Sequence, residues 1–151
     1  MEKYYQEAQQ LFKFLLSMPE SRRALCNELL SIAQQHYAAT SQNMNLSRLV
    51  GWSKAMEEPG FQSPPKWARA AGLQMAFNRG YKLDSPGKIG LAMQILLDYQ
   101  VFNTEEDALG LVLGNLPIAP EWVATAKQLT LEYARYRIAR NIKLGRLPSS
   151  A

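Results

Sequence analysis

The stretch Ser85-Pro86-Gly87-Lys88-Ile89 carries a signal for the start of a helix, and the same signal recurs elsewhere in the chain. A serine side chain accepts hydrogen bonds from the first free backbone N–H groups of a helix, and proline fits the first helical position, where its missing N–H costs nothing. Ser63-Pro64 repeats the pattern. We therefore expect one helix over about 64–79, ended by Gly80, and another over about 86–100.

Helix signals continue on both sides of these segments. Ser17-Met18-Pro19-Glu20 has the spacing of a capping box, which predicts a helix from there to about Thr40. The segment 104–107, Thr-Glu-Glu-Asp, places acids in a first helical turn, where they oppose the positive end of the helix dipole. Apolar residues at a period near 3.6 support the rest. The remaining helices are expected over about 2–17, 46–57, 104–113 and 120–144.

Strand signals are weak, which favours an all-helical fold. The chain contains no Asn-Gly or Asp-Gly hairpin turn, and its β-branched residues do not cluster. Its 151 residues, 47% of them hydrophobic, suffice for a real core without disulfides. With short connectors and no internal repeat, we expect residues 1–151 to form a single all-α domain, a compact irregular bundle of six or seven helices. Most of the large apolar residues in the middle of the chain are assigned to its core (Trp52, Met56, Trp67, Met75 and Phe77).

The sequence favours residence in the cytoplasm. Cys26 is the only cysteine, so no disulfide can form within the chain. The first residues lack the basic segment and apolar run of a signal peptide. No stretch approaches the roughly 18 apolar residues that a membrane-spanning helix requires. We therefore expect no membrane partner.

Motifs for catalysis or metal binding are missing from the sequence. His36 is the only histidine, and it lies on the same expected helix as Cys26, roughly 15 Å away at 1.5 Å per residue. No zinc, phosphate-loop or dinucleotide motif occurs. The acidic clusters Glu57-Glu58 and 105–107 lie at expected helix ends, where capping and the helix dipole explain them. We expect no enzyme, no cofactor and no metal.

Charge is distributed unevenly along the chain, whose net charge is +4. From Trp122 to the end there are six basic residues and one acid, whereas residues 1–121 hold eleven basic and twelve acidic residues. A neutral body with a basic end is typical of proteins that contact a polyanion or an acidic partner.

The segment 132–146 is the most informative part of this basic end. At about 100° per residue, one face of the expected helix combines tyrosines with arginines, while Leu131, Ile138 and Ile142 form an opposite, aliphatic face that we expect to meet the core. Arginine binds phosphate and tyrosine offers a stacking plane. The candidate nucleic-acid-binding residues are Tyr133, Tyr136, Arg137, Arg140, Lys143 and Arg146.

A second interpretation of the same helix remains open. The stripe 122, 126, 129, 133 and 136 has alternating spacings of four and three, which is more typical of a packed seam than of a ligand surface. The first hypothesis is therefore a non-enzymatic protein, alone or as a subunit of a nucleoprotein complex, that binds the phosphate backbone of DNA or RNA. The alternative is a protein-interaction adaptor or small chaperone, with this helix as the seam of a homodimer or partner complex.

One further segment is similar to a DNA-binding motif. Residues 67–73 place Ala68 and Gly72 four apart, as in the first helix and turn of a helix-turn-helix. Asn78, however, stands where the next helix should bury an apolar residue. A glycine inside one continuous helix explains the segment equally well.

Overall fold

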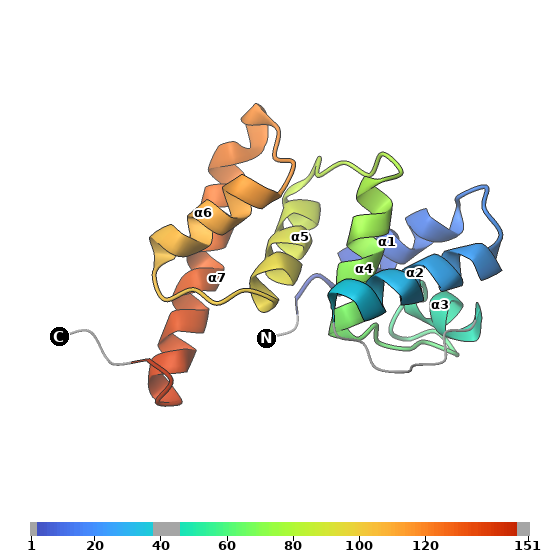
Figure 1. Ribbon diagram of the computed structural model, residues 1–151, viewed down its shortest axis with the longest axis horizontal. Helices are drawn as coiled ribbons and strands as arrows, with labels where there is room; N and C mark the ends of the chain where they lie inside the picture. The colour runs from blue at the N-terminus through green and yellow to red at the C-terminus, as the bar shows by residue number, and fades with distance from the viewer. Residues whose placement is uncertain (1–2, 38–45, 148–151) are drawn as a thin grey trace. The chain divides into compact units, whose positions relative to one another are not determined.

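The computed structural model describes residues 3–37 and 46–147. Within these ranges the regular structure consists of seven α-helices and one 3-10 turn, without a strand, which confirms the all-α class. The chain divides into two compact units, residues 1–82 and 83–151, so the single domain stays a prediction. The first unit contains α1 (Tyr5–Leu16), α2 (Arg22–His36), α3 (Leu46–Trp52) and α4 (Lys66–Phe77); the second contains α5 (Pro86–Asp98), α6 (Glu105–Asn115), the turn η1 (Pro120–Trp122) and α7 (Val123–Lys143) (Figure 1).

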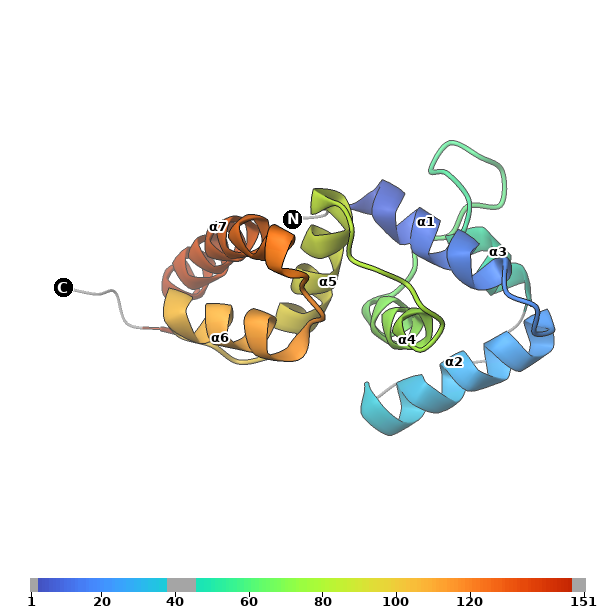
Figure 2. The ribbon, with the colours of Figure 1, turned by 90° about the horizontal axis from the view of Figure 1, so that it is seen from above.

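Helix α4 is the centre of the first unit, with α1 packed on one side of it and α2 on the other (Figure 2). Gly72 permits the approach of α1, because a Cβ atom at this position would lie only 3.2 Å from the ring of Phe12. Since α4 runs without interruption through Gly72, the helix-turn-helix turn considered for residues 67–73 is not formed. The continuous-helix interpretation of this glycine is confirmed.

Arg79, just after α4, ties this helix to α2. Its guanidinium donates to both carboxylate oxygens of Glu28, at 2.8 and 3.0 Å, and to Glu20 at 3.1 Å. The pKa of Arg79 is raised, chiefly by the hydrogen bond to Glu28. A two-pronged guanidinium–carboxylate pair fixes direction as well as distance, so it sets the position of α2 against α4.

Aromatic rings fill the core of the first unit. Trp52 is buried, with its ring centre 5.3 Å from that of Phe12 and 5.8 Å from that of Trp67. Arg48 lies over both tryptophan rings. Of the five residues, most of which were expected in the core, Met56 is 56% exposed and lies outside it. The reason is that α3 ends at Trp52 and not near residue 57, which leaves Met56 in a turn outside the helix.

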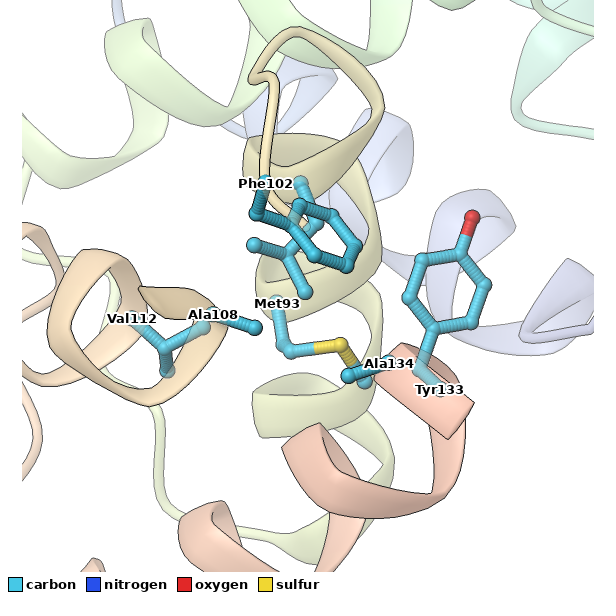
Figure 3. Packing of buried hydrophobic residues seen from close by; sticks show 7 residues of the cluster. Met93, Phe102, Ala108, Val112, Tyr133 and Ala134 are labelled. Carbon is cyan, nitrogen blue, oxygen red and sulfur yellow. The ribbon is translucent and has the colours of Figure 1, made fainter. Parts of the chain in front are cut away.

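The second unit packs α5, α6 and α7 against one another around a small hydrophobic cluster (Figure 3). Met93 of α5 reaches between Ala108 of α6 and Ala134 of α7, and Phe102 covers the cluster from the α5–α6 loop. Burial of side chains such as Met93 and Phe102 contributes about 1.5–3 kcal/mol each to stability. The cluster consists of Met93, Leu97, Phe102, Ala108, Val112, Tyr133 and Ala134.

The helix starts test the capping predictions directly. Ser85 and Thr104 cap α5 and α6 as expected, accepting from the backbone N–H groups three residues ahead at 3.2 and 3.1 Å. The capping box at Ser17 was wrong. Ser21 caps α2 instead, while the Ser17 hydroxyl donates back to the Phe14 carbonyl at the end of α1. The expected extension of α2 to Thr40 lies outside the described residues.

Helix α4 begins at Lys66, two residues later than expected. Proline disfavours the helical conformation of the residue before it, so Pro65 keeps Pro64 out of the helix. Pro65 itself takes the cap position in an extended conformation, without a side-chain cap bond. The serine at position 63 is therefore too far upstream to cap the helix.

Candidate functional site

The buried side of α7 is built largely from small residues. Ala126, Thr130 and Ala134 are fully buried, and α5 and α6 both pack against this helix. The Thr130 hydroxyl donates to the Ala126 carbonyl at 2.7 Å, so its polar atom is satisfied within the helix itself. Small side chains allow neighbouring helices to approach closely, which is why this side is buried although it is not the most aliphatic one.

The aliphatic side that the sequence assigned to the core is only partly used. Ile138 packs against the cluster, but Leu131 and Ile142 are half-buried and do not belong to it. The buried side instead includes Leu129 and Tyr133 from the seam-like stripe. That part of the stripe is thus a contact within the second unit.

Tyr133 and Arg137 form a polar network with the end of α5. The Tyr133 side chain is 9% exposed, and its hydroxyl donates to Asp98. Arg137 donates to the same carboxylate oxygen at 3.0 Å, and its guanidinium lies 5.4 Å from the centre of the Phe102 ring. Burial and the Asp98 hydrogen bond raise the pKa of Tyr133 to about 12. Two of the six candidate residues therefore serve the helix packing.

Arg135, on the outer side of α7, also has an internal partner. Its Nε donates to Glu105, at the start of α6, at 2.6 Å. Asp98 and Glu105 lie 39 and 30 residues from the arginines that they bind. No local pattern in the sequence points to such distant partners, and their roles were missed for that reason.

The other candidates lie at the free end of α7. Arg140, Lys143 and Arg146 are exposed, and none of the three forms an ion pair or a side-chain hydrogen bond within the part of the chain that the structure describes. Tyr136 is 36% exposed, and its ring centre lies 6.2 Å from that of Tyr133. At about 100° per residue, Tyr136, Arg140 and Lys143 share one side of the helix.

A glycine turn holds Arg146 next to these residues. Gly145 has a φ of +73°, its N–H donates to the Ile142 carbonyl, and the N–H of Arg146 donates back to Asn141 at 2.8 Å. These two bonds define a Schellman motif. The turn fixes the backbone of Arg146 at the helix end, three residues after Lys143.

The charge balance of the two units differs from that of the two sequence segments compared above, residues 1–121 and 122–151. Residues 1–82 contain ten basic and six acidic residues, whereas residues 83–151 contain seven of each. Within the second unit, however, no acid occurs from residue 133 to residue 147. Its positive charge is concentrated at one end of α7.

Other features of the molecule offer less. Cys26 is buried, which raises the pKa of its thiol, and it shares the continuous helix α2 with the exposed His36. Across residues 3–37 and 46–147, no three metal-ligating side chains cluster and no helix is long and apolar enough to cross a membrane. A pocket of about 140 Å³ in the first unit has Glu57 as the one acid among its lining residues.

Comparison of the chain with known protein families, with curated proteins and with solved structures finds no match. The candidate site therefore rests on its own geometry. Of the six residues proposed from the sequence, that geometry leaves Tyr136, Arg140, Lys143 and Arg146 exposed in and just after the last turns of α7, and it places Tyr133 and Arg137 in the helix packing.

Proposed function

We propose that this protein binds nucleic acid without catalysing a reaction, and that it contacts the phosphate backbone through Arg140, Lys143 and Arg146. The observation that carries the proposal is the contrast along α7. Arg135 and Arg137 are each held by an acid of a neighbouring helix, whereas the three later cations are exposed and have no acidic partner among the described residues. Exposed cations of this kind are available for phosphate oxygens.

The helix dipole accounts for part of this placement. Cations in the last turn of a helix gain about 0.3–1 kcal/mol from the negative end of the dipole. Arg140 and Lys143 lie in that turn, but Arg146 lies beyond it, after the Gly145 turn. A cluster that extends past the helix favours a ligand over a purely structural role.

The alternative of a partner seam loses its main support. Its stripe needs Leu129 and Tyr133 on an open surface, and both belong to or pack against the core of the second unit. Of this stripe, Tyr136 is exposed, and the exposed cations that follow it suit a polyanion better than an apolar partner surface.

The test is fluorescence anisotropy of labelled DNA and RNA, single-stranded and duplex, over a range of salt concentrations. Three phosphate contacts predict a slope of about −2.1 to −2.7 for log affinity against log salt. Affinity should therefore fall about 20- to 40-fold between about 50 and about 200 mM salt. The triple variant Arg140→Gln, Lys143→Gln, Arg146→Gln should lose most of this slope.

A matched variant controls for net charge. Three other cations are also exposed, namely Arg22, Arg23 and Lys127. Their replacement by glutamine also removes three positive charges, but at positions away from the C-terminal end of α7. The control variant should keep most of the wild-type affinity and most of the slope of log affinity against log salt. Equal losses in the two variants would mean that binding depends on overall charge, and a wild-type protein that binds no nucleic acid at low salt would refute the proposal.

A further inference from the structure

Tyr136 has an environment different from that of Tyr133, the other candidate tyrosine of α7. Tyr133 is buried and bonded to Asp98, so its ring is not accessible to a ligand. Tyr136 is 36% exposed and leans on Tyr133, with an angle of 32° between the two ring planes. An exposed ring that already contacts a buried neighbouring ring loses little conformational freedom when a flat group stacks on it.

Two of the cations lie on the same side of α7 as this ring. Arg140 follows Tyr136 by four residues and Lys143 by seven, so both are within about 40° of it around the helix axis. Residues four apart on a helix have Cβ atoms about 5–6 Å from each other. An exposed ring and two exposed cations thus occupy successive turns of one helix side.

This combination matches a nucleotide in which the base is unpaired. A base inside a duplex is already stacked on both sides, and only its edge is accessible in a groove. A single strand offers both a free base face and flanking phosphates, and aromatic side chains next to cations are the usual means of binding it. A duplex could use the cations but not the ring.

Resting on the proposed function, we infer that the preferred ligand is single-stranded nucleic acid, with one base stacked on Tyr136 and its neighbouring phosphates on Arg140 and Lys143. Stacking of one base on an aromatic ring changes affinity by between about 5-fold and 150-fold. The full-length protein should prefer a single strand to a duplex of equal length by a factor in this range.

The experiment compares three labelled probes by anisotropy at one low salt concentration. They are an oligothymidylate of about 12 nucleotides, a strand of the same length that carries abasic sites, and a duplex. The abasic strand keeps the phosphates and removes the bases. It should therefore bind at least about 5-fold more weakly than the oligothymidylate and about as well as the duplex.

Two variants locate the effect on the ring. Tyr136→Phe keeps a stacking plane and should keep the preference for the single strand, whereas Tyr136→Leu should lower the affinity for the oligothymidylate to that for the abasic strand. Equal binding of the oligothymidylate and the abasic strand by the wild-type protein would overturn the inference while leaving the phosphate contacts intact. Wild-type affinity of Tyr136→Leu for the oligothymidylate would also overturn it. If no probe binds, the proposed function fails together with the inference.

Discussion

Replacement of Tyr133 by phenylalanine tests whether this residue belongs to the helix packing. The substitution removes only the hydroxyl that donates to Asp98, and Arg137 stays 3.0 Å from the same carboxylate oxygen. A hydrogen bond to a charged group contributes about 1.5–3 kcal/mol. Because Asp98 keeps one partner, we expect a loss at the lower end, about 1.5 kcal/mol at pH 7. For a chain of this size that lowers the melting temperature by about 3–6 °C.

The same variant should change the alkaline limit of stability. The pKa of Tyr133 is about 12 in the folded protein, against an ordinary value of 10.0. Since folding raises this pKa, the contribution to stability is complete below about pH 10 and is lost as the pH rises towards 12. A difference of two units corresponds to about 2–3 kcal/mol. Tyr133→Phe should lack this component of the alkaline destabilisation.

Urea unfolding followed by circular dichroism, at pH 7 and at several values above 9, measures both effects. A double-mutant cycle with Asp98→Asn isolates the hydroxyl–carboxylate pair, and we expect a coupling energy of at least about 1 kcal/mol. Affinity for nucleic acid should stay unchanged in Tyr133→Phe. A loss below about 0.5 kcal/mol at pH 7, with the wild-type alkaline profile retained, would refute the role of Tyr133 in the network.

Three further predictions concern other parts of the chain. Gly145→Ala places a Cβ atom at a φ of +73°, which should cost about 1–2 kcal/mol at the end of α7 and speed amide exchange of Arg146; unchanged exchange would contradict the glycine turn. Arg79→Ala leaves Glu28 and Glu20 without their cation, and since Glu28 is 40% exposed we expect a loss of only about 1–2 kcal/mol in urea unfolding. The buried Cys26, with its raised thiol pKa, should react with a water-soluble disulfide reagent only after unfolding, so fast labelling of the native protein would show that α2 opens.

Local signals predicted most of the helices, and they failed where distant contacts or adjacent residues competed. Ser85 and Thr104 cap their helices because the cap bond involves only residues three positions apart. The box at Ser17 failed because Ser21, four residues later, caps α2 instead, while the Ser17 hydroxyl donates to the Phe14 carbonyl. Glu20, the other member of the expected box, binds Arg79, 59 residues further along the chain, and no local pattern reveals that contact.

The candidate site was predictable in part for a similar reason. Exposure of Arg140 and Lys143 follows from the helical period and from their position near the helix end. The burial of Tyr133 does not, because hydrophobicity alone favours the side of Leu131 over a side that contains Thr130. Ala126 and Ala134 are small, and the Thr130 hydroxyl is hydrogen-bonded within α7, so this side of the helix can be buried. Its burial depends on how closely α5 and α6 approach α7.

The balanced charge of the second unit affects how it would meet a strand. Its seven cations and seven acids cancel when viewed from beyond the Debye length, about 8 Å at physiological ionic strength. At shorter range the acid-free end of α7 dominates the local field. The charges of this unit would thus contribute little long-range attraction towards a polyanion. On close approach, the local positive field would orient the unit so that the end of α7 faces the polyanion. Binding of this kind selects orientation before it adds affinity.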